Sequence, residues 1–339
     1  MKKLLGLTLA QLTELTASIG LRSFAAKQMA SWLYGKRVTE ISQMTDLPKR
    51  ARDMLTERGY VVGREAPIME ARSVDGTAKY VFAGVNGRDI EAVYIPDKER
   101  ATLCVSSQAG CRMGCHFCMT GQLGWHGNLD AGAIINQVLS IPESDKLTNI
   151  VFMGMGEPAD NIDAVLTAIE ILTAQWGMAW SPRRITVSSI GKIDGMRRLL
   201  EQTQVHIALS IHSPFALERA RLMPVEKAYP IREILPLLKE HDFAHQRRLS
   251  MEYTMFAGIN DDARHAEALV RVLKGLNARV NLIRFHRTPG FDGRPSDRPT
   301  MERFRDSLNE AGITATIRAS RGEDIMAACG MLAGKSKND

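Results

Sequence analysis

Short strand-like runs alternate with helix-length periodic segments from about residue 102 onward, and this alternation constrains the fold more than any other feature. It is typical of βα units that build a parallel sheet. About six such units are fewer than the eight of a closed TIM barrel, so we expect an α/β fold with an open, partial (β/α)6 barrel and a site at the carboxyl ends of its strands. Strands are expected at 102–107, 149–154, 184–189, 205–211, 249–256, 280–285 and 313–318. Helices are expected near 130–140, 161–176, 192–202, 231–241, 262–276 and 299–311, with Asn161 capping the second and Gly177 ending it.

The residues before the barrel predict two smaller units. Residues 8–59 indicate three helices near 8–18, 22–34 and 47–58, and Asn86-Gly87 between the strand-like runs 78–82 and 89–95 is a strong hairpin signal. We therefore predict a helical accessory domain at 1–65, a β-hairpin extension at 66–100, the barrel at 101–332 and a disordered tail at 333–339.

The helical segment is basic. Residues 1–60 contain ten Lys and Arg against five Asp and Glu. Such a balance suits binding to a phosphate backbone, although an ordinary solvated surface can reach it too.

Composition restricts the class of protein. Hydrophobic residues make up 45% and charged residues 24% of the chain, which are ordinary values for a globular protein. We find no run of about 18 apolar residues, and the apolar stretch at the start is too short for a signal peptide, so a cytoplasmic protein without membrane association is expected. The five cysteines are odd in number and three lie within residues 111–118, which favours metal ligation over disulfides.

Those three cysteines, Cys111, Cys115 and Cys118, are spaced as Cys-x3-Cys-x2-Cys after the first expected barrel strand. Three thiolates can hold three irons of a [4Fe–4S] cluster and leave the fourth open to a non-protein ligand, which in radical S-adenosylmethionine (SAM) enzymes is the amino and carboxylate group of SAM. A zinc site that recruits His116 or His126 is the alternative.

A Met-Gly-Met-Gly-Glu-Pro turn at 153–158 follows the apolar strand that begins at 149. Gly156 permits close backbone approach to a ligand, and Glu157 offers a carboxylate to an ammonium group. A structural βα turn explains the same residues equally well. In sequence order after the cysteine loop, however, the turn resembles the radical SAM motif that holds the methionine part of SAM.

From its N-terminal helices to Leu332 the chain resembles the RlmN family of bacterial ribosomal and transfer RNA adenine methyltransferases, which includes the antibiotic-resistance relative Cfr. The residues that carry the resemblance lie at 91–96, 101–108, 111–118, 156–158, 210–213, 281–283 and 327–330.

The resemblance implies roles for two isolated cysteines. Cys329 would take a methyl group from one SAM, and a radical generated from a second SAM would activate that methyl group for addition to carbon 2 of adenine. Cys104 would remove the ring proton and release the product by forming a Cys104–Cys329 disulfide. Read alone, either cysteine is a small buried hydrophobic residue.

The resemblance also implies the remaining site residues and partners. Glu91 would accept a proton near the base. An RNA-docking role for the basic helices, 23S rRNA and tRNA as substrates, flavodoxin or ferredoxin as electron donor and a monomeric state are expected as well. His286 stands where some relatives carry Asn, and both can hydrogen-bond to SAM. The expected SAM contacts are Gly156, Glu157, Ser188, Ser210, Ile211, His212 and His286.

Two other functions stay open at this point. The first is methylation at carbon 8 of adenosine, as in Cfr, which shares the stretches at 181–184 and 221–224. The second is a non-enzymatic, metal-stabilised RNA-binding protein, which would need neither the Gly-Glu-Pro turn nor Cys329.

Overall fold

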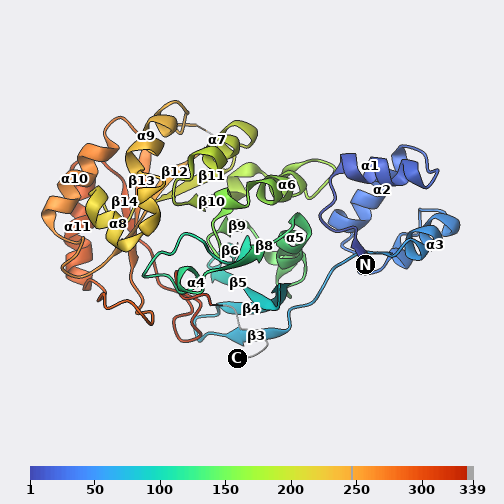
Figure 1. Ribbon diagram of the computed structural model, residues 1–339, viewed down its shortest axis with the longest axis horizontal. Coiled ribbons are helices and arrows are strands. Elements are labelled where there is room, and N and C mark those ends of the chain that lie inside the picture. The colour runs from blue at the N-terminus through green and yellow to red at the C-terminus, as the bar shows by residue number, and fades with distance from the viewer. Residues whose placement is uncertain (246, 334–339) are drawn as a thin grey trace.

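A computed structural model describes residues 1–245 and 247–333. Its main feature is a 10-stranded sheet in the order β14-β13-β12-β11-β10-β9-β6-β5-β4-β3 (Figure 1). Because β14 and β3 are the two ends of that order, the sheet is not closed on itself. The predicted α/β fold with an open, partial barrel is therefore confirmed.

The barrel part consists of parallel neighbours. Its strands are β6 (Arg100–Cys104), β9 (Asn149–Phe152), β10 (Ile185–Ser189), β11 (His206–Ser210), β12 (Leu249–Met255), β13 (Ala278–Arg284) and β14 (Ala315–Ile317). The helices between them are α4 (Met119–Gln122), α5 (Ala131–Leu139), α6 (Ile162–Thr173), α7 (Ile193–Gln202), α8 (Ala216–Leu222), α9 (Ile231–Lys239), α10 (Ala263–Leu273) and α11 (Arg298–Glu310). Each strand and helix expected from the alternation is found, and α4 and α8 are additional helices.

Three antiparallel strands continue the sheet beyond β6, namely β3 (Met69–Arg72), β4 (Ala78–Val85) and β5 (Arg88–Asp97). The turn between β4 and β5 has positive φ at Asn86 (53°) and Gly87 (74°). Two successive positive φ angles are what a two-residue hairpin loop requires, so this part of the extension is as predicted. No sequence pattern predicted β3.

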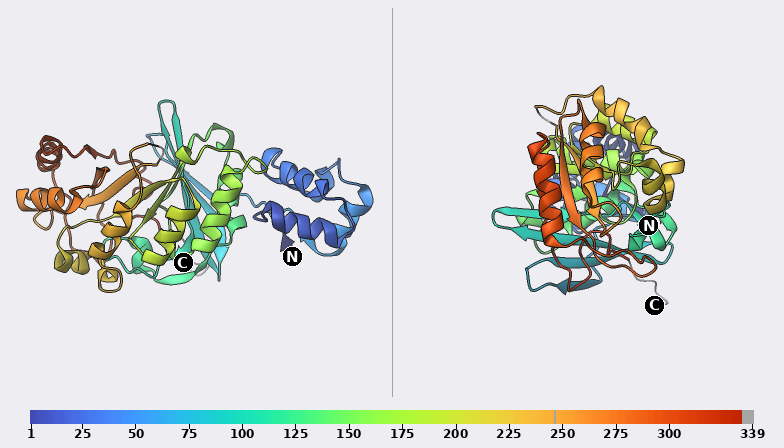
Figure 2. Two further views of the ribbon diagram at one scale, coloured as in Figure 1. Left: turned by 90° about the horizontal axis from the view of Figure 1, so that it is seen from above. Right: turned by 90° about the vertical axis from the view of Figure 1, so that its left-hand side faces the viewer.

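The N-terminal helices α1 (Leu9–Ser18), α2 (Phe24–Ala30) and α3 (Lys49–Glu57) lie at the opposite end of the molecule from β14 (Figures 1 and 2). Strand β1 (Lys2–Lys3), which precedes these helices, pairs in parallel with β2 (Tyr60–Val61), which follows them. Arg64 then joins this region to the barrel by donating to the carbonyl oxygen of Leu139. Whether residues 1–65 fold as a separate domain stays a prediction, and the expected tail lies outside the described residues except for Ala333.

Two predicted helix ends need correction. Asn161 precedes α6, but its side chain does not cap the helix: Nδ2 donates to the carbonyl oxygens of Ser107 and Leu129, each at 2.8 Å. The helix ends at Thr173 and therefore before Gly177. A Cβ atom added to Gly177 would lie 2.0 Å from the carbonyl oxygen of Ile171. The side chain of Asn161 therefore serves the tertiary fold, and Gly177 lets the chain turn back against the end of α6. Within the described residues, no helix is long and apolar enough to cross a membrane.

Candidate active site

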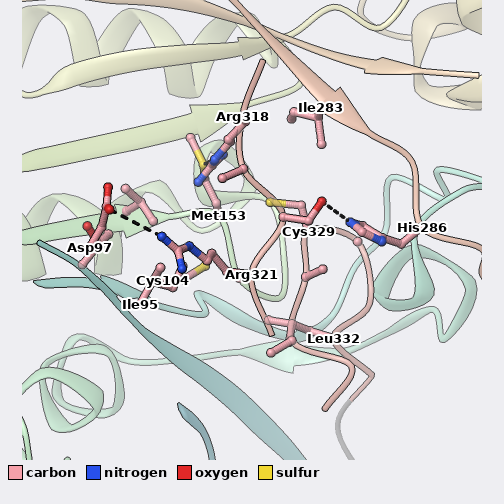
Figure 3. A pocket seen from close by; sticks show the side chains of 18 of the residues that line it. Ile95, Asp97, Cys104, Met153, Ile283, His286, Arg318, Arg321, Cys329 and Leu332 are labelled. Carbon is pink, nitrogen blue, oxygen red and sulfur yellow. Dashed lines mark hydrogen bonds and ion pairs between the residues drawn. The ribbon is translucent and has the colours of Figure 1, made fainter. Parts of the chain in front are cut away.

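Two adjoining cavities open at the carboxyl ends of the parallel strands. The first has a volume of about 360 Å³, within the range of pockets that hold small ligands, and includes Cys104, His286 and Cys329 in its walls (Figure 3). The second contains the three loop cysteines and most of the predicted SAM contacts. The residues common to both walls are Cys118, Met153, Gly154, Ile283, Arg318, Cys329 and Gly330.

The cysteine loop does not follow the first barrel strand directly, because the short strand β7 (Gln108–Gly110) comes between them and pairs with β8 (Trp125–Asn128). Gly110 has a positive φ of 74°, and a Cβ atom there would lie 1.9 Å from the carbonyl oxygen of Gly124. The N–H of Cys111 donates to the same oxygen at 2.8 Å. The hairpin thus fixes where the loop begins.

The three thiols pack against an apolar cluster. Burial raises the pKa of Cys111 to about 12. Burial also raises the pKa of Cys115 and Cys118, and for Cys115 the neighbouring Cys118 thiol raises it further while Arg219 lowers it. Each thiol therefore keeps its proton until a metal replaces it.

The thiols fit a cluster better than a single ion. In the part of the chain that the structure describes, no three His, Cys, Asp or Glu side chains converge on one metal position. Zinc requires three or four protein ligands that converge on one ion, whereas each thiolate of a [4Fe–4S] cluster binds its own iron. The spread of Cys111, Cys115 and Cys118 over one cavity wall agrees with the second arrangement.

The Gly-Glu-Pro turn links two strands. Glu157 is buried, and its Oε1 accepts from the N–H of Ala159 at 2.9 Å while Oε2 accepts from Ile190 at 3.0 Å. Burial raises its pKa to about 7. Each carboxylate oxygen has a second lone pair, so a structural role leaves room for a ligand ammonium. Gly156, with a φ of 99°, would place a Cβ atom 2.6 Å from Cβ of Gln108.

The other predicted SAM contacts divide into two groups. Ser188, Ser210 and His212 line the second cavity beside Glu157. The Nδ1 of His212 accepts from the N–H of Thr254 at 3.0 Å, and burial lowers the pKa of this histidine to about 3, so it is neutral. Ile211 lies in the core, outside both walls.

His286 lies in the first cavity, whereas Ser188 and Ser210 lie in the second. Its Nε2 is 3.0 Å from Oγ of Ser320. The structure therefore places this histidine on the side of the reactive cysteines. A contact from there with SAM stays a prediction.

Cys104 and Cys329 face the same cavity from different segments (Figure 3). Cys104 ends β6 and is buried, which raises its pKa to about 12, while Arg318 acts in the opposite direction. Cys329 is exposed. Both are free thiols, so the implied disulfide is not formed here and stays a prediction for one step of the reaction.

Glu91, on β5, is not brought into either cavity wall. It is buried, its Oε1 lies 3.5 Å from Nζ of Lys79, and its Oε2 accepts from the N–H of Ala333 at 3.3 Å. Its role as a proton acceptor stays a prediction.

Sequence reasoning missed Arg219, which is fully buried. It donates to the carbonyl oxygens of Ile190 at 2.8 Å, Ser210 at 3.0 Å and Ile211 at 3.1 Å, and it pairs with Glu226. A charged residue on the inner side of a short helix is the only sequence signal that could have revealed it. Arg219 fixes the carboxyl ends of β10 and β11, where the second cavity begins.

Comparison with known proteins gives a consistent result. Residues 2–61 match the model of the ribosomal RNA large subunit methyltransferase N-terminal domain, and residues 105–270 match the radical SAM superfamily. A relative from Bacteroides thetaiotaomicron, named as a probable dual-specificity RNA methyltransferase RlmN, is 56% identical over 97% of this chain and 95% of its own length. A Syntrophobacter fumaroxidans protein named dual-specificity RNA methyltransferase RlmN is 42% identical over 96% of both chains.

A solved structure agrees as well. The crystal structure of a radical SAM methyltransferase from Sphaerobacter thermophilus is 39% identical, superposes with a TM-score of 0.91, and covers 98% of this chain and 99% of its own.

Proposed function

The chain belongs to the RlmN family of dual-specificity RNA methyltransferases, and from that premise we propose that it methylates carbon 2 of an adenosine in 23S rRNA and in tRNA. It is a radical SAM enzyme that uses a [4Fe–4S] cluster and SAM. Electrons would come from a flavodoxin or ferredoxin, and the enzyme would act as a cytoplasmic monomer. The basic helices at the N-terminus would dock the RNA.

The observation that supports this proposal most is the position of Cys329. Its thiol belongs to both cavity walls, whereas Cys104 lines only the first and Glu157 only the second. One thiol can therefore face the cofactor on one side and a base on the other. A structural metal site would need no such arrangement.

The residues would divide the reaction as follows. Cys111, Cys115 and Cys118 hold the cluster, and Glu157 with Ser188, Ser210 and His212 holds SAM. When bound, these groups supply the methyl group, an electron and a carbon-centred radical. Cys329 gives up its thiol proton when its sulfur accepts the methyl group.

The two cysteines would complete the product. The carbon on Cys329 would bond to the base, and the adduct would return its unpaired electron to the one-electron donor system. The ring proton would pass to the thiolate of Cys104, which releases that proton again to solvent. The sulfur of Cys104 then bonds to that of Cys329, and the carbon–sulfur bond breaks. Its electron pair stays with carbon, which takes a proton to finish the methyl group.

Mass spectrometry of the nucleoside product tests the function. The anaerobically reconstituted enzyme is incubated with an RNA fragment, SAM and a reductant, and the digested RNA is compared with standards of 2-methyladenosine and 8-methyladenosine. We expect only 2-methyladenosine, and none with Cys118→Ala. Formation of 8-methyladenosine would assign the Cfr-type activity, and RNA that stays unmodified would refute both.

A further inference from the structure

Glu252, on β12, has a carboxylate oxygen that the protein leaves unused. Its side chain is buried, and Oε1 accepts from Nδ2 of Asn281 at 2.8 Å and from Oγ of Ser250 at 3.0 Å. Oε2 is equally buried, yet it has no hydrogen-bond partner among residues 1–245 and 247–333. Burying an acceptor without a partner costs free energy that folding does not recover.

The nearest cation does not satisfy this oxygen. Nη1 of Arg318 lies 3.7 Å from Oε2, which is too far for a hydrogen bond, and the same atom donates to Sδ of Met153 at 3.4 Å. Arg318 therefore balances the charge of Glu252 and leaves its lone pairs free. A carboxylate in this state is suited to accept from a ligand.

Glu252 lines the second cavity, together with Ser210 and Thr254. On the sheet it is paired with Ser210 of β11 on one side and with Asn281 of β13 on the other. The residue that carries the unused oxygen thus belongs to the wall of the proposed SAM site.

The position on the sheet indicates which part of SAM would meet it. Glu157 follows β9, and β10 and β11 lie between β9 and β12. Three strand spacings are about 14 Å, so an ammonium group held at Glu157 cannot also reach Glu252. Across from the methionine end lie the ribose and the adenine, and hydrogen bonding of a ribose hydroxyl to a buried acidic residue is a common mode of nucleoside recognition.

We propose that Oε2 of Glu252 accepts a hydrogen bond from a ribose hydroxyl of SAM, and so fixes the nucleoside end of SAM in the second cavity. This assignment rests on the proposed radical SAM function. It adds a binding residue that neither the cysteine loop nor the Gly-Glu-Pro turn predicts.

The test measures a coupling between residue and ligand. The dissociation constants of SAM, 2′-deoxy-SAM and 3′-deoxy-SAM are determined by calorimetry for the anaerobically reconstituted wild-type protein and for Glu252→Gln. In the wild type, loss of the contacted hydroxyl should weaken binding by about tenfold or more, since hydrogen bonds to charged groups are the strong ones. In Glu252→Gln, removal of the same hydroxyl should weaken binding by a markedly smaller factor.

Two further variants separate this role from a structural one. Glu252→Asp keeps the charge beside Arg318 but withdraws the carboxylate by one methylene, so it should behave like Glu252→Gln, and it replaces that variant if the latter does not fold. Glu143→Gln is the matched control, because Glu143 is a buried glutamate paired with Arg72 at 2.9 Å outside both cavities. Its affinity for all three ligands should equal that of the wild type.

The outcomes are distinct. If removal of either hydroxyl weakens SAM binding by the same factor in the wild type and in both Glu252 variants, Glu252 only balances the charge of Arg318 and the inference is wrong. A wild-type protein that does not bind SAM would instead refute the proposed function.

Discussion

Replacing Arg219 tests whether one buried cation holds the strand ends that shape the second cavity. Its side chain is 0% exposed, and its guanidinium bonds three carbonyl oxygens and the carboxylate of Glu226. Arg219→Met keeps an unbranched apolar stem, although a shorter one, and removes every donor. Breaking a buried pair by removing one partner costs about 3–5 kcal/mol, because the other charge stays buried.

The contacts of Glu226 indicate a destabilisation near the lower end of this range. Glu226 also accepts from the N–H of Ile231 at 3.0 Å, so its carboxylate would keep one donor. We therefore expect a loss of about 3 kcal/mol in the free energy of unfolding, measured by urea denaturation of the reduced apoprotein. The double variant Arg219→Met with Glu226→Leu should be more stable than Arg219→Met alone, because no unpaired charge remains.

A surface pair provides the control. Arg321 lies 3.4 Å from Asp97 with both side chains partly exposed, and Arg321→Met should cost less than about 1 kcal/mol. If Arg219→Met costs no more than this control, or if the double variant is less stable than the single one, the buried pair does not hold the strand ends.

Four other predictions follow from the site. Cys118→Ala should lose the iron and the brown colour of the reconstituted protein, measured by iron analysis, and full iron content would contradict ligation by this thiol. Glu157→Gln should weaken SAM binding by roughly tenfold or more in calorimetry, while an unchanged affinity would reduce the turn to a structural one. His212 has a pKa near 3 in the folded state and 6.5 in the unfolded state, so this residue destabilises the fold increasingly as the pH falls below 6.5. The free energy of unfolding should therefore fall less between pH 6.5 and 5 in His212→Asn than in the wild type, by up to about 2 kcal/mol, and an equal fall in both proteins would exclude this cause. Cys104→Ala should accumulate a protein–RNA crosslink in denaturing electrophoresis whereas Cys329→Ala should form none, and identical behaviour of the two would mean that their roles are assigned wrongly.

The helices and strands that could be predicted are those that local sequence patterns determine. The barrel strands and helices follow from periodicity, and the β4–β5 hairpin follows from Asn86 and Gly87, whose positive φ angles are a local requirement. Strands β3 (Met-Glu-Ala-Arg) and β7 (Gln-Ala-Gly) contain no β-branched or aromatic residue, so no strand pattern could be recognised in them. Asn161 shows the limit clearly: its position before a helix was readable, but its amide bonds to Ser107 and Leu129 depend on the tertiary fold.

That Cys111, Cys115 and Cys118 lie at one cavity was predictable, because metal ligation dictates their spacing along the chain. Arg219 and Glu252 could not be found in this way, because groups that they bond, at Ile190, Ser210 and Asn281, lie on other segments of the sheet. A buried charge has no sequence signature of its own. It becomes visible only when the atoms around it are known.

The connection between the cluster loop and Cys329 explains how two distant segments can serve one reaction. Helix α4 (Met119–Gln122) begins directly after Cys118, and its residues bind the C-terminal segment at two points. The N–H of Met119 donates to the carbonyl oxygen of Gly330 at 2.8 Å, and Oγ1 of Thr120 donates to that of Leu332 at 2.5 Å. Both acceptors lie within three residues after Cys329, so the loop that carries Cys111, Cys115 and Cys118 also sets where the thiol of Cys329 lies. Any change that displaces Cys118 should therefore displace Cys329 as well, although the two are separated by most of the barrel in sequence.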